Sequence, residues 1–281
     1  MIEKRKASFD KPLKSCQLCG SSAIVPYHRD FKGRNISRCI DCGIQFLNPQ
    51  YSDSFLKRYY ADYSREDAAW EEPLNYCHHH YLSLIERHVS PGSLLDIGSG
   101  EGHLLRAACQ RGWRGEGYEI DAKLAGRTAA KLGLKVRHGR FSALPLARGS
   151  LDLVSMHNVL EHVKDPSLYL DKSRSLLKRA GILFLVLPNV RSRSSALKFL
   201  LERLGLRRRR VGSYYDADHH LWYFTPRVAR RELTRRGFKV LCLRSGHAAR
   251  PGQSPLKRAW CRNVGDLLPW KSTFLLIARK T

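Results

Sequence analysis

The stretch from Asp96 to Gly102 is the part of this chain whose residue types and spacing best suit ligand binding. It reads D-I-G-S-G-E-G, follows an apolar run of strand character at 94–95, and leads into a helical pattern at His103. Glycine allows positive φ angles and has no Cβ, so the backbone can approach a ligand closely. A dinucleotide fingerprint, G-x-G-x-x-G, would require glycine at position 103, which is His103. The loop therefore predicts a nucleotide-like ligand, and taken alone it indicates only weakly which one.

Glu119 has the spacing expected of a ribose ligand. It lies 19 residues after Gly100, near the end of a second strand-like run at 115–121. A carboxylate offers two acceptor oxygens to the two ribose hydroxyls, and Rossmann-type folds place an acid at about this position. Asp121 is the alternative, but it directly precedes the helical pattern of 122–132, which favours a role as helix N-cap.

Four of the eight cysteines form two closely spaced pairs near the N-terminus, Cys16 with Cys19 and Cys39 with Cys42. The pattern C-x2-C-x19-C-x2-C has the spacing of a four-thiolate zinc site, and glycine follows each pair. Zinc contributes about 10–16 kcal/mol of folding free energy in small zinc modules, and this segment is too short for a core of its own. Disulfides are the alternative, disfavoured in a cytosolic protein. Because four protein ligands leave no open coordination position, we predict a structural zinc ribbon.

The elements that would position these residues alternate between strand and helix. The predicted strands are 94–97, 115–121, 134–137, 151–156, 182–187, 238–243 and 272–278, and the predicted helices are 102–111, 122–132, 167–178 and 226–236. Such alternation predicts an α/β fold with a Rossmann-like, mostly parallel sheet and helices on both faces. Ligands bind at the carboxyl ends of the strands in such sheets. The glycine loop, Glu119, the 138–145 loop, the 157–162 segment and Asn189 would all lie at that edge.

The same patterns divide the chain into four parts. We expect a flexible tail at 1–14, the zinc ribbon at 15–48, a helical connector or lid at 49–92, and the ligand-binding domain at 93–281 with a basic insertion at about 190–225. Tyrosines 59, 60 and 63 recur at helical spacing in the connector. This spacing favours a helix that packs on the main domain, and a lid over cofactor or substrate is the alternative.

The chain is strongly basic, with a formal net charge of +25. Residues 190–281 contain 22 Lys and Arg against 5 Asp and Glu, so this region carries about two-thirds of the excess. Such a surface attracts nucleic acid, other polyanions or an acidic membrane surface, although a solvated arginine-rich face would carry the same charge. No apolar run approaches the roughly 18 residues of a membrane helix. The first residues also lack the apolar segment of a secretory signal, so we expect a cytoplasmic protein.

Taken together, these motifs resemble the class I S-adenosylmethionine (SAM) dependent methyltransferase family over about residues 90–245. The D-x-G-x-G-x-G loop is similar to the first motif of that family. Leu-Glu-His-Val at 160–163 and the segment H-H-L-W-Y-F-T-P at 219–226 resemble ubiquinone- and sugar-modifying members. The four-cysteine ribbon resembles that of members acting on nucleotide-linked sugars, glycans or natural-product precursors, and also that of certain ribosomal RNA guanine methyltransferases.

The resemblance implies a role for each matching residue in holding SAM. Asp96 and the backbone of Gly98 and Gly100 would hold the amino-acid end of SAM, and Glu119 would hold the ribose. His157 would lie beside the methionine moiety, and the loop at 140–142 would border the adenine.

Two positions depart from the pattern of the family. Many members have an acid where this chain has Arg140, which cannot accept a hydrogen bond from the adenine amino group. We expect Phe141 to stack on the adenine ring and Ser142 to act as the acceptor instead. Some quinone-modifying members bind a divalent ion through Glu-x-x-Glu-His, whereas this chain has Asn158 at the first of those positions, which indicates metal-independent chemistry.

Methyl transfer to oxygen or carbon needs orientation of the reactants and a general base. His162 is the first candidate for the base because it follows the fourth strand, next to the expected methyl position. His219 and His220 come next, and Glu161 could orient a histidine. The alternative for Glu161 and His162 is helix capping and packing within the fold.

Three functions remain open on the sequence. The first is methyl transfer to a small-molecule acceptor such as a sugar, a glycan or lipid-linked precursor, or a natural-product intermediate. The second is an RNA methyltransferase whose ribbon and basic C-terminal third bind phosphates. The third is a non-enzymatic zinc-ribbon adaptor with a degenerate methyltransferase domain. The 157–163 and 219–226 segments favour the first function, the charge favours the second, and Arg140 alone supports the third.

Overall fold

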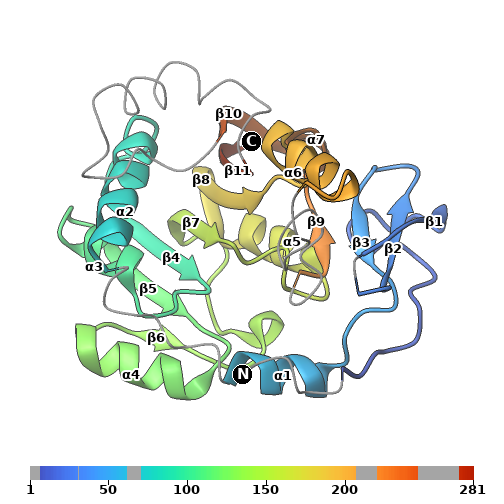
Figure 1. The fold of residues 1–281 in the computed structure, drawn as a ribbon. Helices are drawn as coiled ribbons and strands as arrows, with labels where there is room; N and C mark the ends of the chain where they lie inside the picture. The colour runs from blue at the N-terminus through green and yellow to red at the C-terminus, as the bar shows by residue number, and fades with distance from the viewer. Residues whose placement is uncertain (1–6, 31, 62–70, 207–219, 246–271) are drawn as a thin grey trace.

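A seven-stranded sheet forms the centre of the molecule (Figure 1). A computed structural model describes residues 7–30, 32–61, 71–206, 220–245 and 272–281. The sheet has the order β10-β11-β8-β7-β4-β5-β6. Its strands are β4 (Ser93–Ile97), β5 (Arg114–Tyr118), β6 (Val136–Arg137), β7 (Leu151–His157), β8 (Leu177–Pro188), β10 (Phe238–Ser245) and β11 (Thr273–Lys280). The four pairings among β6, β5, β4, β7 and β8 are parallel, and β11 pairs antiparallel with both β8 and β10. The predicted mostly parallel α/β fold is confirmed.

Helices flank this sheet, and several of them begin after a capping side chain. They are α1 (Asp53–Ala61), α2 (Glu71–Ile85), α3 (His103–Cys109), α4 (Ala122–Leu132), α5 (Pro166–Leu176), α6 (Arg193–Arg203) and α7 (Pro226–Arg235). Asp121 caps α4 by accepting hydrogen bonds from the backbone N–H groups of Lys123 (2.8 Å) and Leu124 (3.2 Å). Gly133 ends the helix at a φ of 65°. The predicted helix at 122–132 is confirmed, and so is the capping role of Asp121.

The sheet is buried on both faces, which explains why β4, β7 and β8 read as nearly continuous apolar runs. Leu94, Leu95 and Ile97 of β4 are completely buried, as are Leu153 and Val154 of β7. Gly117 in β5 permits a close approach of the glycine loop to the sheet. A Cβ there would lie 2.7 Å from Ser99 Oγ and 2.9 Å from Leu105 Cδ1. The packing of β5 against the loop and α3 therefore requires glycine at this position.

A second sheet contains the ribbon strands and one strand from much later in the chain. It has the order β1-β2-β3-β9, with β1 (Ile24–Arg29), β2 (Asn35–Cys39), β3 (Gln45–Leu47) and β9 (Trp222–Tyr223). Phe46 of β3 pairs with Trp222 of β9, and their ring centroids lie 5.0 Å apart. One buried cluster contains apolar residues of the ribbon together with residues of the large sheet such as Met156 and Leu185. The ribbon thus shares its core with the α/β sheet, a contact that the sequence does not predict.

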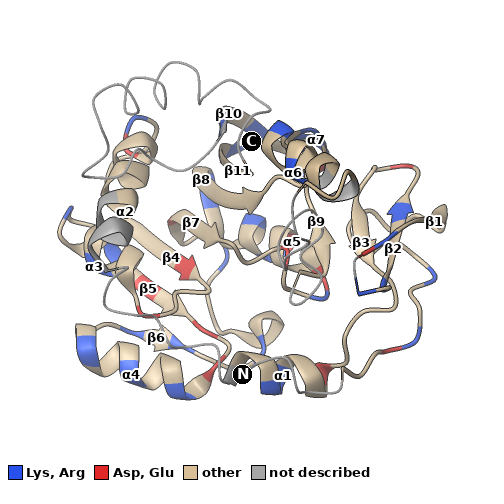
Figure 2. Ribbon diagram, in the orientation of Figure 1, with Lys and Arg blue, Asp and Glu red and all other residues tan. Residues whose placement is uncertain are grey.

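Charged residues are spread over many elements. Figure 2 shows basic positions on α1, α4, α7 and β2. Nine of the 22 Lys and Arg residues after position 190 lie outside the described residues, namely 207–210, 250, 257, 258, 262 and 271. Within the described ranges, no helix has the length and apolar character needed to cross a membrane.

Candidate active site and cysteine cluster

The glycine loop lies at the carboxyl end of β4, with its glycines in the left-handed region. The φ angles are 72° at Gly98, 52° at Gly100 and 76° at Gly102. A Cβ on Gly98 would lie 2.6 Å from Val159 Cγ2, whereas a Cβ on Gly100 would meet nothing within 4 Å. Gly98 is therefore packed against the segment after β7, and Gly100 borders open space. This arrangement suits a loop that supports a ligand at Gly100 and contacts the 158–163 segment at Gly98.

Asp96 is a buried carboxyl group directly before this loop. It is 4% exposed and accepts a hydrogen bond from Ser155 Oγ at 2.6 Å. Burial raises the pKa of Asp96 to about 7, and the nearby Glu119 carboxylate adds to the rise, against the hydrogen bond from Ser155. A cationic ligand would favour the charged form of this carboxyl. The amino group of SAM is such a cation, so the residues present fit the amino-acid end of SAM.

Glu119 lies across the loop from β4 and holds the loop in place. Its Oε2 accepts the N–H of Gly100 at 3.1 Å, and its Oε1 accepts the N–H of Asp121 at 3.2 Å. A carboxylate has about four lone-pair sites, so both oxygens keep acceptor capacity for a ribose diol. The structure therefore brings Asp96, Gly98, Gly100 and Glu119 together at one edge of the sheet. The predicted strand at 115–121 ends at Tyr118, which leaves Glu119 at the strand end to face the loop.

The loop predicted to border adenine is held by a residue that the sequence did not single out. The Lys172 ammonium donates to the backbone carbonyls of Phe141 (2.5 Å), Ser142 (2.9 Å) and Leu144 (3.2 Å). The Phe141 ring is buried and stacks on Tyr169 at a centroid distance of 4.4 Å. The side chains of Arg140 and Ser142 are exposed. Because the ring of Phe141 is packed within the protein, its stacking on adenine stays a prediction, as does the role of Ser142.

His157 ends β7 within a group of aromatic rings. Its ring centroid lies 5.5 Å from that of His78 and 5.6 Å from that of Tyr81, both on α2. His78 is 6% exposed. The run of three histidines at 78–80 cannot share one helix face, and the sequence gives no sign that one of them reaches the carboxyl edge of the sheet. Residue His78 is thus a neighbour of the candidate site that sequence reasoning missed.

Glu161, His162 and His220 form a compact group beside the glycine loop. One ligand atom from each lies within 4.8 Å of the others, and the Nε2 of His162 lies 3.8 Å from Glu161 Oε1. The ring centroids of His162 and His220 are 4.9 Å apart, and Tyr60 of α1 lies 6.0 Å from His162. Such a group can accept a proton or bind a cation. The other predicted histidine, His219, lies outside the described residues.

The Glu161 side chain is buried without a hydrogen-bond partner. It is 1% exposed, and neither carboxylate oxygen has a partner among the described residues. Burial raises its pKa to about 8. At neutral pH a carboxyl group with this pKa is mainly protonated, and a cation such as a histidinium beside it would favour the charged form.

Backbone hydrogen bonds connect this group to β9 and hence to the ribbon. The Glu161 carbonyl accepts the N–H groups of Leu221 (2.7 Å) and Trp222 (3.2 Å). The indole N–H of Trp222 donates to the Val163 carbonyl at 2.7 Å. His220, which directly precedes these two residues, is thereby placed against His162. Because β9 also pairs with β3, the ribbon sheet forms one side of the Glu161 group.

We expect Glu161→Gln to remove a pH dependence of stability. The pKa of Glu161 is about 8 in the folded chain and about 4.3 in an unfolded one. Between these values the folded state binds the extra proton, so wild-type stability falls as the pH rises toward 8 and above. Denaturant unfolding measures the free energy of unfolding at about pH 5 and at about pH 9. The decline in this free energy between the two pH values should be smaller by a few kcal/mol in the glutamine variant. Equal declines in the two proteins would mean that Glu161 is already ionised at neutral pH.

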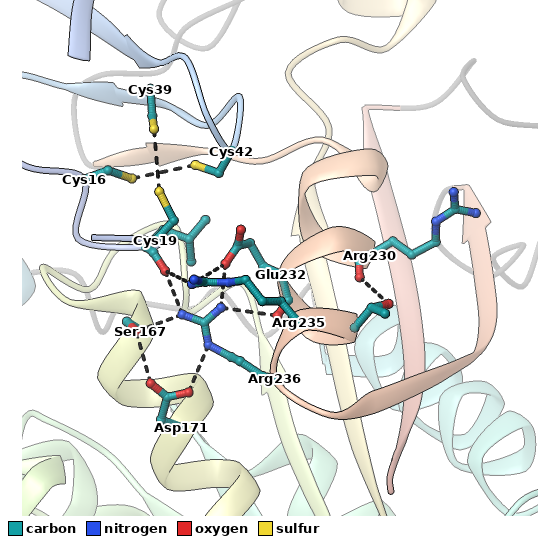
Figure 3. Close-up of polar contacts among 12 residues, drawn as sticks. Cys16, Cys19, Cys39, Cys42, Ser167, Asp171, Arg230, Glu232, Arg235 and Arg236 are labelled. Carbon is teal, nitrogen blue, oxygen red and sulfur yellow. Dashed lines mark hydrogen bonds and ion pairs between the residues drawn. The ribbon is translucent and has the colours of Figure 1, made fainter. Parts of the chain in front are cut away.

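The four N-terminal cysteines converge on one point, as Figure 3 shows. The Sγ atoms of Cys16 and Cys42 lie 3.7 Å apart, and those of Cys19 and Cys39 lie 3.6 Å apart. These separations are too long for disulfides, and a tetrahedral zinc site with Zn–S bonds of about 2.3 Å places its sulfurs about 3.8 Å apart. The donor set and spacing therefore fit a zinc ion.

Arg231 of α7 and Arg236, which directly follows that helix, donate hydrogen bonds to backbone carbonyl groups between the cysteines of each pair. Arg236 Nη2 donates to the Leu18 carbonyl at 2.7 Å, and Arg231 donates to the Asp41 carbonyl. The Arg236 guanidinium also pairs with Glu232 at 2.6 Å and with Asp171 at 3.0 Å (Figure 3). The side chains of Arg236 and Glu232 are 6% and 2% exposed, so this pair is buried. The bonds of Arg236 hold the loop between Cys16 and Cys19 against α5 and α7.

The comparison with protein families identifies the α/β part of the chain. The profile described as "Methyltransferase domain" matches residues 69–243, more than half of the chain. The chain belongs to the methyltransferase domain family. The matched region of this methyltransferase domain contains Asp96, Glu119, Glu161, His162 and His220, and the four clustered cysteines precede it.

Relatives and solved structures agree with this assignment. An uncharacterized methyltransferase from Mycobacterium sp. (strain KMS) is 36% identical over 28% of this chain and 32% of its own length. An uncharacterized protein from Methanocaldococcus jannaschii is 25% identical over 42% of this chain and 56% of its own length. The chain thus spans about a third to a little over half of the length of these relatives. SAM-dependent methyltransferases from Archaeoglobus fulgidus and Thermotoga maritima, each 16% identical over 80% of this chain, cover 99% and 98% of their own lengths with TM-scores of 0.55 and 0.56. These likenesses show the fold.

Proposed function

We propose that this protein transfers a methyl group from SAM to an oxygen or carbon nucleophile of a small molecule. The acceptor class that the motifs favour is a sugar, a glycan or lipid-linked precursor, or a natural-product intermediate. The observation that carries the proposal is the group of Glu161, His162 and His220 next to a glycine loop of the methyltransferase type. A cofactor pocket and a proton acceptor at one sheet edge are what this reaction requires.

The residues at the end of β4 and β5 are proposed to hold SAM, which supplies an electrophilic methyl group on a sulfonium. Asp96 would pair with the amino group of SAM, and the loop at Gly98 and Gly100 would lie against its amino-acid end. Glu119 would accept hydrogen bonds from the ribose hydroxyls. Phe141, Ser142 and His157 complete the proposed set at the adenine and methionine ends.

His162 is proposed as the general base. Its ring is partly exposed, with 18% side-chain exposure, and it can therefore meet an acceptor hydroxyl. The buried carboxyl group of Glu161, whose Oε1 lies 3.8 Å from His162 Nε2, would orient the His162 ring while that ring takes the proton. His220 lies on the other side of His162 as a second candidate base, and the untested His219 precedes it.

The cysteine cluster is proposed to hold a structural zinc ion through Cys16, Cys19, Cys39 and Cys42. Four thiolates this close repel one another unless a cation neutralises them. With four protein ligands the ion would have no open position, so its role would be to fold the ribbon and keep β3 in place. Since β3 pairs with β9, the ion would also support the position of His220.

We expect His162→Asn to lower the rate of methyl transfer by about 10²–10⁴-fold while leaving SAM affinity unchanged. The assay incubates the protein with methyl-labelled SAM and either a small-molecule extract or total RNA from the source cells, and then follows the label. The matched control is His88→Asn, because His88 precedes β4 and lies at the opposite edge of the sheet. Label in the small-molecule fraction that depends on His162 is the expected result.

Other results of this assay would point to other functions. Label that enters RNA would support the RNA methyltransferase, and SAM binding without transfer to either fraction would support the adaptor. If transfer requires an added divalent ion and stops with a chelator that leaves the cysteine-bound zinc in place, Glu161, His162 and His220 act as metal ligands. The proposal of a histidine base would then be wrong.

A further inference from the structure

Helix α6 has an exposed stripe of leucines. Nine large hydrophobic residues are exposed in the described part of the chain, and four of them lie between positions 197 and 206. These are Leu197 (56%), Leu200 (52%), Leu204 (62%) and Leu206 (73%). Spacings of three and four residues put Leu197, Leu200 and Leu204 on one side of a helix. The N–H of Leu204 still donates to the Leu200 carbonyl at 3.0 Å, so the stripe continues through the end of the helix.

Two serines are buried where the start of α6 meets the protein. Ser192 and Ser195 are buried, and their hydroxyl groups share a hydrogen bond of 2.7 Å. A helix on the surface of a globular domain normally turns its apolar side inward. Here Leu197, Leu200 and Leu204 are exposed instead, and a contiguous apolar patch on a surface usually marks an interaction site.

The sequence on both sides of the stripe is strongly basic. Arg191 and Arg193 are exposed at the start of α6. In the sequence, residues 190–210 contain eight Lys and Arg and a single acid, Glu202. A helix with outward leucines and flanking cations has the composition of an element that lies in the interface of an anionic bilayer.

We propose that α6 docks on an anionic membrane surface, with Leu197, Leu200 and Leu204 entering the headgroup region. Each leucine would leave water for an apolar environment, and the arginines would remain among lipid phosphates. The two contributions act together, because anionic lipid raises the local concentration of a cationic protein and the leucines then hold it.

Two other partners fit the same surface less well. RNA would satisfy the arginines, but it offers phosphates and base faces rather than apolar volume for leucine side chains. A second copy of this chain could cover the leucines, but it would bring together two basic helices on molecules of charge +25. An anionic bilayer complements both the apolar stripe and the charge.

The position of α6 relates this surface to the candidate active site. The helix follows the carboxyl end of β8, beyond the buried Asn189, and precedes His220 in the chain. If the proposed methyl transfer is correct, a membrane on this side would present a lipid-linked acceptor at the edge of the sheet that carries His162. The docking itself does not depend on that reaction, since it needs no SAM.

The experiment measures binding of the full chain to lipid vesicles by co-sedimentation without SAM. One set of vesicles is phosphatidylcholine, and in the other about a third of the lipid is phosphatidylglycerol. We expect wild type to bind the anionic vesicles at least about tenfold more tightly, and the triple variant L197S/L200S/L204S to lose at least about tenfold. Ile120→Ser is the control, because Ile120 is equally exposed (61%) but lies apart from α6, after β5. The substituted leucines are exposed, so circular dichroism should show unchanged folding.

Four results would overturn the proposal. Wild type could fail to bind anionic vesicles, or the triple variant could bind them as tightly as wild type does. Ultracentrifugation could show a wild-type dimer that the triple variant cannot form, which would make a second copy the partner. Finally, the leucine substitutions could weaken binding to RNA while vesicle binding stays absent.

Discussion

The Cys42→Ser variant is expected to lose the proposed zinc ion, the fold of the ribbon and the position of His220 together. Zinc binding contributes about 10–16 kcal/mol in small zinc modules, as much as or more than the 5–15 kcal/mol net stability of a typical domain. The ribbon has its strands paired to β9 and its apolar residues in one cluster with the large sheet. Loss of the ion should therefore lower the melting temperature of the whole chain and abolish methyl transfer, with zinc content measured by atomic absorption.

Cys109→Ser is the matched control for this effect. Cys109 ends α3, lies outside the cysteine cluster and is partly exposed, so the same change of sulfur to oxygen should leave zinc content and activity near wild type. The account of the ribbon would fail if Cys42→Ser kept one zinc per chain. It would also fail if the variant lost zinc while amide exchange in β3 and β9 stayed as slow as in wild type.

Gly98→Ala should reduce the affinity for SAM by about 100-fold, equivalent to about 2.7 kcal/mol. Its Cβ would lie 2.6 Å from Val159 Cγ2, and the residue has a φ of 72°. The loop or the 158–163 segment would have to move, and either movement displaces the proposed SAM ligands or His162. Calorimetric titration with SAM measures the affinity directly.

Substitutions at two further glycines distinguish the effect of backbone strain from the effect of contact with the ligand. Gly133 has a φ of 65° with nothing within 4 Å of an added Cβ, and it lies at the end of α4. Gly133→Ala should therefore cost about 1–2 kcal/mol of stability and leave SAM affinity unchanged. Gly100 has equally open surroundings but faces the proposed ligand, so Gly100→Ala should weaken SAM binding with only a similar loss of stability. Equal SAM affinities in the three variants would contradict the placement of SAM at this loop.

Local sequence patterns were sufficient to predict the sheet, the glycine loop and the cysteine cluster. The buried run of β4, the cap at Asp121 and the cysteine spacing each depend on residues close together in the chain. The resemblance also named Glu161, His162 and His220 before the structure brought their side chains within reach of one another.

Long-range contacts could not be predicted in the same way. The pairing of β9 with β3 joins residues about 175 positions apart and rests on only two residues of β9. Two other long-range contacts join a side chain to backbone carbonyl groups, namely those of Lys172 with the 141–144 loop and of Arg236 with Leu18. Every residue provides a backbone carbonyl, so no residue type in the sequence indicates these contacts. The exposure of the α6 leucines could not be predicted either, because a helical pattern does not show which side of the helix faces the protein.

Titration of the wild-type chain with SAM tests whether the glycine loop binds this cofactor. We expect one site per chain with a Kd in the micromolar range, about −8 kcal/mol. We also expect Glu119→Ala to weaken this binding by at least about tenfold, because Glu119 holds Gly100 and would hold the ribose hydroxyls. Absence of binding heat and of any rise in melting temperature at millimolar SAM would contradict these expectations.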